Sequence, residues 1–193
     1  GAIVLASSPV DDRDAAHDAL VEGVRVEGLA LLPRLADADD WRARVAFVRT
    51  HLGDEWPATD DAALLDRLDD WLRPALVARD VRRARDLARV DVTAALATLL
   101  PWALAARLDE LAPTHVTTPN GRRRRVDYAA PDPVVSVRLQ DAFGWTATPR
   151  LAGGRVPVVI SLLSPADRPV QVTRDLAGFW TGSYAQVRAE LRG

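Results

Sequence analysis

Apolar residues recur at intervals of three and four through the first 112 positions, a spacing that predicts amphipathic helices. The first helix is expected over 11–33 with a break near Gly28, and the second is expected to follow Asp37–Asp40 and to end at 51–53. Because the predicted helices are short and separated by loops, residues 11–112 are expected to form an orthogonal bundle rather than a long coiled coil.

The rest of this bundle is predicted from helix-capping and helix-breaking residues. Thr59 is expected to N-cap a third helix, and Pro74 is expected to end it. The basic stretch 81–89 is predicted to be helical. Asp91 is expected to cap the following helix, and Pro101 is expected to separate it from the last one.

After Pro113 the pattern changes to the two-residue alternation that is typical of strands. Asn120-Gly121 lies between two strand-like runs, which predicts a hairpin with a two-residue turn. A third strand is expected over 134–139, and a second hairpin around Gly153-Gly154. The sequence therefore predicts an α+β fold: a helical sub-domain over 11–112, then a small mixed sheet with a C-terminal helix over 113–193.

Four residues in the last fifty positions carry specific structural expectations. Pro157 lies in the strand-like run 156–162 and predicts that this strand is at an edge of its sheet. Thr173 is expected to N-cap the C-terminal helix. Gly178 and Gly182 are four positions apart, which predicts a shallow groove where another backbone could pack closely.

Composition excludes several functional classes. All 25 basic residues are arginine, and cysteine and methionine are absent. Without lysine the chain cannot contain a phosphate-binding GxxxxGK[ST] loop, and without cysteine it has no disulfide or thiolate site. It contains neither a basic leader before its first apolar run nor an apolar run long enough for a membrane span. We expect the protein to have no membrane partner and to be located in the cytoplasm. We also expect this chain to be a part of a longer parent protein.

Charge is divided unequally along the chain. Residues 1–112 hold 14 arginines against 21 acidic residues, whereas residues 113–193 hold 11 against 6. The second half is therefore positive, and it is where contact with a polyanion is expected.

Residues typical of catalytic or metal sites are dispersed. His17, His51 and His115 lie far apart in the sequence without metal-ligand spacing, so we predict no metal site. No GxSxG sequence marks a nucleophile, and Ser164 precedes a proline, which favours a turn. The acidic clusters mostly start or flank predicted helices, where solvated caps explain them. We therefore predict no catalytic residue in this chain.

The best candidate for function is the run Arg122-Arg123-Arg124-Arg125. On a strand, Arg122 and Arg124 would face one way and Arg123 and Arg125 the other. Guanidinium groups pair with phosphates, so the hairpin could lie against a nucleic-acid backbone, with help from Arg138 and Arg155. The alternative is a solvated strand edge whose charge prevents aggregation. Aromatic side chains offer little support for base stacking, since Phe143 is expected in the core.

Four phrases of the second half are similar to one protein family: PNGRRRRVDY, VRLQDAFG, PRLAGGRVPVVISLLSPADRPVQVTRDLAGFW and YAQVRAELRG. They resemble the C-terminal region of the bacterial HrpB family of DExH-box ATP-dependent helicases. Weaker similarity extends upstream through WPATDDAALLDRLDDWLRPAL and LLPWALAARLDELAP. GAIVLA resembles the last strand of an OB-like domain, which would make residues 1–10 the end of a preceding domain.

The resemblance implies a role within a larger enzyme. In this family two RecA-like motor domains, with their ATP and Mg²⁺ sites, lie upstream of the segment seen here, so no catalytic residue or cofactor is carried over. The family also continues past Gly193 into a further tail. The chain is then expected to contact nucleic acid, RNA in particular, or to brace the motor domains of the same chain. The alternative is that the chain is a protein–protein interaction module. A third hypothesis, a stand-alone enzyme, is supported only by dispersed His and Ser residues.

Overall fold

The computed structural model describes residues 9–190 and confirms the predicted α+β class. The described residues divide into two compact units, one within 1–42 and 57–105 and the other within 43–56 and 106–193. The predicted OB-like remnant, residues 1–10, lies outside the described residues except for its last two, which begin the first helix. Compactness does not test which segments fold alone, so the predicted domain limits stay predictions.

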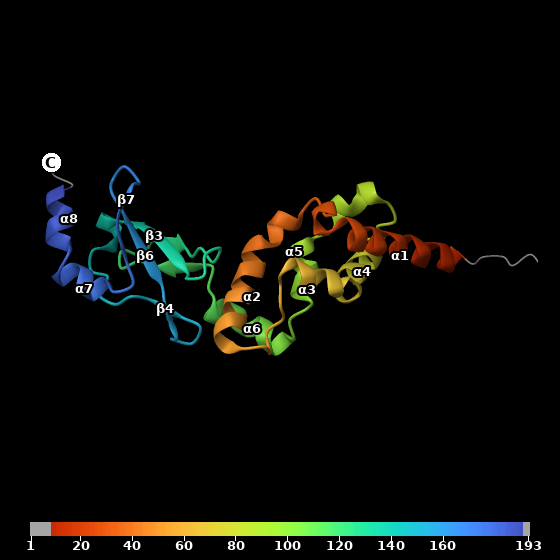
Figure 1. Ribbon diagram of the computed structural model, residues 1–193, viewed down its shortest axis with the longest axis horizontal. Helices are drawn as coiled ribbons and strands as arrows, with labels where there is room; N and C mark the ends of the chain where they lie inside the picture. Colours follow the sequence, from red (N-terminus) through yellow and green to blue (C-terminus); the bar gives the residue numbers. More distant parts are fainter. Residues whose placement is uncertain (1–8, 191–193) are drawn as a thin grey trace, which may run out of the picture. The chain divides into compact units, whose positions relative to one another are not determined.

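The first unit is helical (Figure 1). Its elements are α1 (Pro9–Glu27), the 3₁₀ turns η1 (Leu29–Leu31) and η2 (Leu35–Ala38), the start of α2 (Asp39–Leu52), α3 (Asp61–Asp66), α4 (Leu68–Ala78), the 3₁₀ segment η3 (Ala84–Arg89), α5 (Val92–Ala97) and the start of α6 (Trp102–Leu111). Helix α4 packs against both α1 and α5. This arrangement of short packed helices is the predicted bundle.

Pro74 does not end a helix, contrary to the prediction. It lies inside α4, and the chain breaks earlier, at Arg67 between α3 and α4. Trp71 and Leu76 of α4 are completely buried, and the Trp71 indole N–H donates to the Leu64 carbonyl at 3.0 Å. Burial of this helix face outweighs the one backbone hydrogen bond that proline removes.

The capping residues were predicted with mixed success. Asp91 caps α5 as expected, since its carboxylate accepts from the Ala94 N–H at 3.0 Å. The N-cap of α3 is Asp60 rather than Thr59. The Thr59 hydroxyl donates instead to the Arg42 carbonyl, because that side chain is buried against α2.

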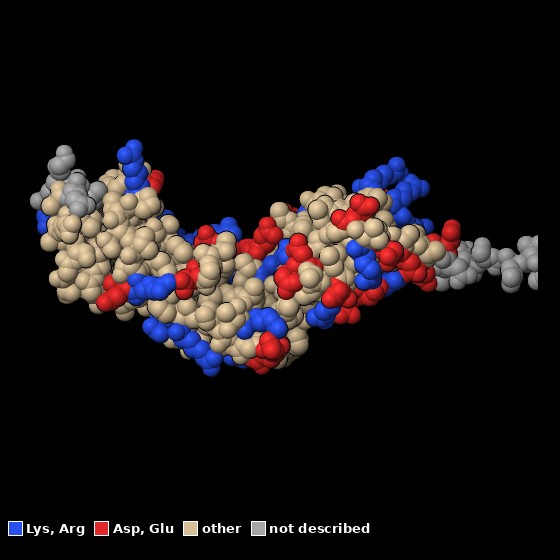
Figure 2. Space-filling model, viewed as in Figure 1, with Lys and Arg blue, Asp and Glu red and all other residues tan. Residues whose placement is uncertain are grey.

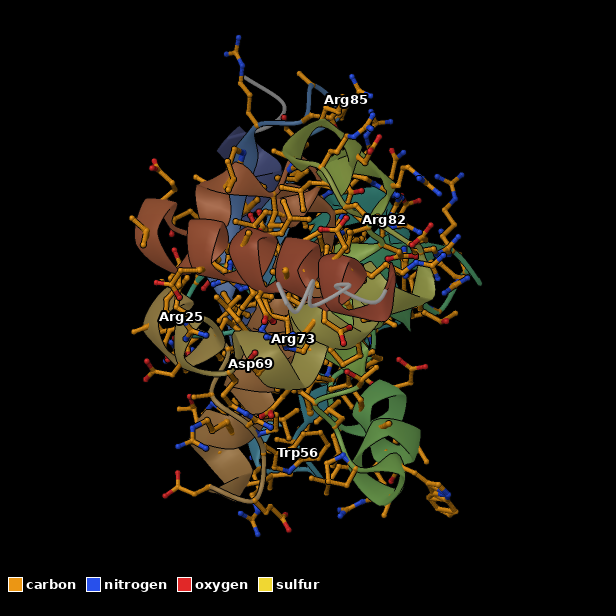
Figure 3. All side chains as sticks on the ribbon, turned by 90° about the vertical axis from the view of Figure 1, so that its right-hand side faces the viewer. Arg25, Trp56, Asp69, Arg73, Arg82 and Arg85 are labelled. Atoms are coloured by element: carbon orange, nitrogen blue, oxygen red, sulfur yellow. The ribbon has the colours of Figure 1, made fainter. Side chains whose placement is uncertain are left out.

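Two groups of charged side chains stand out on the surface of the helical unit. Figure 3 shows Arg25 of α1 beside Asp69 and Arg73 of α4, and both arginines pair with the Asp69 carboxylate. The hydrogen bond from Arg73, followed by that from Arg25, holds the pKa of Asp69 below its usual value despite some desolvation. The second group lies in 81–89, where Arg82 and Arg85 are exposed, and Figure 2 shows basic side chains projecting over η3.

The second unit is built on small sheets. β3 (Val134–Arg138) runs parallel to β6 (Val159–Leu163), which pairs antiparallel with β7 (Pro169–Thr173). Two hairpins, β1 (His115–Thr117) with β2 (Arg123–Arg125) and β4 (Arg150–Leu151) with β5 (Val156–Pro157), form separate two-stranded sheets. The 3₁₀ turn η4 (Leu139–Ala142) follows β3, and α7 (Leu176–Thr181) and α8 (Tyr184–Glu190) end the described chain (Figure 1).

The run 156–163 is not one edge strand, contrary to the prediction from Pro157. The Val158 N–H donates to the Pro149 carbonyl beside β4, whereas the next N–H, that of Val159, donates to the Pro133 carbonyl beside β3. The chain thus changes partners between these two residues. Pro157 remains in the two-stranded β4–β5 sheet, and β6 becomes the central strand, with Ile160 completely buried.

The predicted C-terminal helix is two short helices, and its N-cap is Asp175 rather than Thr173. The Asp175 carboxylate accepts from the Gly178 N–H at 2.9 Å. A Cβ at Gly178 would come within 2.3 Å of this carboxylate, and one at Gly182 within 3.1 Å of the Gly178 carbonyl oxygen. The two glycines therefore accommodate the local cap and the end of α7. The groove that the sequence predicts for a partner backbone stays a prediction.

No helix among residues 9–190 combines the length and the apolar character that crossing a membrane requires.

Candidate nucleic-acid interface

The arginine run lies on a hairpin, as the sequence predicted. β1 and β2 pair antiparallel with Val116 opposite Arg124. The turn is longer than predicted, because the Thr118 N–H bonds to the Arg122 carbonyl and leaves three residues, 119–121, in the loop. Gly121 has φ +79°, the left-handed conformation that ends such three-residue turns and that glycine adopts most easily.

One buried carboxylate, that of Asp141 in η4, anchors the tip of this hairpin. It is 4% exposed and receives hydrogen bonds from Arg124 Nη2 at 2.6 Å, Asn120 Nδ2 at 3.0 Å and Arg122 Nη1 at 3.3 Å. Arg122 and Arg124 therefore lie on one face, as the strand alternation predicted. Their guanidinium groups are held in place before any ligand arrives.

Ionisation of Asp141 depends on a balance between burial and its partners. Burial disfavours the charged form, but the hydrogen bonds from Arg124 and Asn120 and the charges of Arg122 and Arg124 outweigh it, so the pKa of Asp141 lies below its usual value. The sequence reasoning missed this residue. The available signal was an acid within the largely apolar segment VRLQDAFG, in the same positively charged half of the chain as the four arginines.

Replacing Asp141 by asparagine should make the stability of the chain less sensitive to acid. Because the pKa is lowered in the folded state, the carboxylate stabilises the fold above about pH 4, the value of an unfolded aspartate, and this contribution is lost as the pH falls through the folded pKa. Thermal melts followed by circular dichroism should show the wild type above D141N near neutral pH, with the gap closing as the pH falls below about 4, the value of an unfolded aspartate. A gap that stays constant across this range would contradict the assignment.

Arg138 of β3 joins Arg122 and Arg124 in one pocket. We call it the arginine pocket; it is lined by Arg122, Arg124, Ser136, Arg138, Leu163 and Asp167. Arg138 makes a bidentate pair with Asp167, with both distances 2.8 Å. This pair lowers the pKa of Asp167 and raises that of Arg138. The side chains of Arg138 and Asp167 are 41% and 59% exposed, so solvent and a phosphate can reach the pair.

Arg123 and Arg125 face the opposite side of the hairpin, also as predicted. They line a second open depression together with His115, Arg124, Asp127, Val134 and Ser136, so Arg124 and Ser136 border both depressions. Arg123 Nη2 lies 3.4 Å from His115 Nδ1. The hairpin thus presents guanidinium groups on both of its faces.

Arg155 is not brought to this site. It lies in the β4–β5 hairpin, where its Nη1 donates to the His51 carbonyl at 3.0 Å. It lines neither of the two depressions formed around β2. Of the six arginines predicted to contact nucleic acid, five therefore gather on β2 and β3 or directly before β2.

Phe143 is exposed rather than buried, contrary to the prediction. Its side chain follows η4 and is 51% exposed. One side of its ring packs on Trp180, with centroids 5.6 Å apart, and on Tyr184 at 6.0 Å. An exposed aromatic ring with an aromatic support therefore lies two residues after Asp141.

Comparison with known proteins places this geometry in a family. Residues 71–193, more than half of the chain, match the HrpB_C family, described as ATP-dependent helicase C-terminal. The chain belongs to this family. The resemblance recognised in the sequence is thereby confirmed, and the segment is the C-terminal region of an HrpB-type helicase.

Longer relatives extend the match. The ATP-dependent RNA helicase HrpB of Escherichia coli is 41% identical over 182 residues, which cover 93% of this chain and 22% of that protein. Two crystal structures of E. coli HrpB, described as a DExH-box NTPase and as a DEAH/RHA helicase, match with TM-scores of 0.85 and 0.78 at 40% and 38% identity. The matches include 98% and 95% of this chain, and in each case 23% of the E. coli HrpB chain. The chain thus spans less than a quarter of the length of these HrpB relatives.

Proposed function

We propose that this chain is the accessory region through which an HrpB-type helicase contacts the phosphate backbone of RNA. The observation that carries the proposal is the arginine pocket, in which Arg122, Arg124 and Arg138 converge. Asp141 holds two of them in position, so little side-chain entropy remains to be lost when phosphate binds. RNA is the proposed polymer because the E. coli relative is named an RNA helicase.

The charge balance around the hairpin supports binding of a polyanion. The arginine pocket holds three arginines, Arg122, Arg124 and Arg138, with one lining aspartate, Asp167, and the buried Asp141 beside them. Asp141 is committed to the hairpin itself. Guanidinium groups that remain in excess pair with phosphates and release counterions from the nucleic acid.

Titration of the 193-residue chain with a fluorescent single-stranded RNA at several salt concentrations tests the proposal. The logarithm of the binding constant should fall linearly with the logarithm of salt, by about 0.7 for each phosphate contacted on a single strand. Contact with two or more phosphates thus gives a slope of about −1.4 or steeper. Absent binding, or binding with a slope near zero, would exclude this role.

A second role, contact with the motor domains of the same chain, has its own observation. An apolar groove between α4 and α5 is lined largely by Trp71, Pro74, Ala75, Ala78, Ala94 and Ala95. Such a groove suits a protein surface rather than a polyanion. Motor domains supplied as a separate chain should then co-elute with this chain in the absence of RNA.

The activity of the parent is part of the same proposal. ATP and Mg²⁺ would bind in motor domains outside this chain, which itself would hydrolyse nothing. The cytoplasmic location stays a prediction from composition.

A further inference from the structure

The turn that buries Asp141 also exposes an aromatic ring. η4 is a 3₁₀ turn with three residues per turn, so Gln140 and Phe143 lie on its outer side while Leu139, Asp141 and Ala142 are buried. Phe143 is consequently held at a fixed place relative to the carboxylate that orients the arginines. Its position is further fixed by Trp180 and Tyr184 of the C-terminal helices, which pack on it.

An apolar surface adjoins the arginine pocket at this point. We call it the Phe143 shelf; it is lined by Arg138, Leu139, Gln140, Phe143, Leu163 and Pro165. Arg138 and Leu163 line both the shelf and the arginine pocket. A polar compartment suited to phosphate and an apolar one suited to a flat ring are therefore neighbours that share two residues.

We infer that the Phe143 shelf binds one unpaired nucleobase of an RNA strand whose phosphates lie in the arginine pocket. This inference rests on the proposed function and names the form of nucleic acid that the site takes. Bases of a duplex are stacked and paired and cannot reach the ring, whereas bases of a single strand can be splayed onto an aromatic side chain. The site therefore selects single-stranded RNA.

Base stacking also gives a reason for an exposed Phe143 ring next to the guanidinium of Arg138. An aromatic face attracts any base, because each base has a π-face, and the guanidinium of Arg138 at the edge of the shelf contributes a neighbouring positive charge. The recognition is independent of base identity. Affinity for short homopolymers should therefore vary little with sequence.

Binding of two probes by the full 193-residue chain separates stacking from phosphate contact. One probe is a short single-stranded RNA, and the other is an abasic oligonucleotide of the same length and charge. Phe143→Ala should weaken binding of the RNA by about 5- to 150-fold and leave binding of the abasic probe and its salt slope unchanged. Phe143→Tyr should bind both probes like the wild type, and Phe143→Leu, which keeps apolar contact with Trp180, should behave like the alanine variant.

A matched control is Trp102→Ala, which removes another exposed aromatic side chain, 79% exposed, from the helical unit. It should change binding of neither probe. Equal affinity of the wild type for the two probes would overturn the inference while leaving the proposed phosphate contact intact. Equal loss of both probes in F143A, or binding of a protein segment at the shelf that RNA does not displace, would overturn it as well. Failure of the wild type to bind either probe would overturn both the inference and the proposed function.

Discussion

Replacing Arg122, Arg123, Arg124 and Arg125 together by serine should weaken RNA binding and flatten its salt dependence. Removal of one arginine–phosphate pair takes about 0.7 from the slope for a single strand, and removal of four therefore takes up to about 3. Over a fourfold rise in salt, the wild type would then lose up to about 50-fold more affinity than the variant. Anisotropy titrations at several salt concentrations measure this difference directly.

A charge-matched control is available in the helical unit. Replacing Arg82, Arg83, Arg85 and Arg89 by serine removes the same four charges from exposed positions of the chain. This variant should keep the wild-type salt dependence of RNA binding, because we propose that the phosphate contacts lie at the hairpin. If both quadruple variants lose slope equally, binding reflects total charge, and the hairpin has no special role.

The hairpin variant also removes the arginine partners of Asp141, so its effect on folding has to be separated from its effect on binding. Arg123→Ser with Arg125→Ser leaves Arg122, Arg124 and Asn120 around that carboxylate. This double variant should melt like the wild type and show up to about half of the slope change. A normal melt with an unchanged slope would confine the phosphate contacts to the arginine pocket.

Replacing Trp71 by alanine should destabilise the helical unit by about 3–5 kcal/mol. Its side chain is completely buried in α4, between the helices that pack on either side, and its indole N–H donates to the Leu64 carbonyl. The substitution leaves a cavity and removes one hydrogen bond from the Leu64 carbonyl, which still accepts from the Arg67 N–H at 3.3 Å. Since small domains are stable by only about 5–15 kcal/mol, this loss is a large fraction of the total.

Denaturant unfolding of Trp71→Ala, with Trp102→Ala beside it, tests this expectation. Trp102 is 79% exposed, so its removal should change the free energy of unfolding by less than about 0.5 kcal/mol. A loss below about 1 kcal/mol for Trp71→Ala would mean that this face of α4 does not form the centre of the helical core.

The sequence predicted those elements that local chemistry decides. Asp91 caps its helix because the cap needs only residues three positions away, and the hairpin forms around Gly121 because its turn needs a residue with positive φ. Arg122 and Arg124 share a face because strand alternation is a property of the backbone. These features require no knowledge of what packs against them.

Features set by distant contacts were not predictable in this way. Pro74 continues a helix because α4 is buried between other helices, and β6 becomes central because its backbone changes partners at Val158 and Val159. Asp141 becomes the anchor of the hairpin through contacts 17 to 21 residues away. At η4 the side chain of Asp141 is on the buried side, and that of Phe143 is on the exposed side. Because the burial of Asp141 was not predicted, the position of Phe143 was predicted wrongly.

The central claim, that the hairpin and β3 form the RNA contact, is tested most directly by mapping the binding surface. Backbone amide signals of the isotope-labelled 193-residue chain should be followed by NMR during titration with single-stranded RNA. We predict that the largest changes in chemical shift occur for the amides of residues 115–125 and 134–143. Changes concentrated in 81–89, with the signals of 115–125 unmoved, would contradict it.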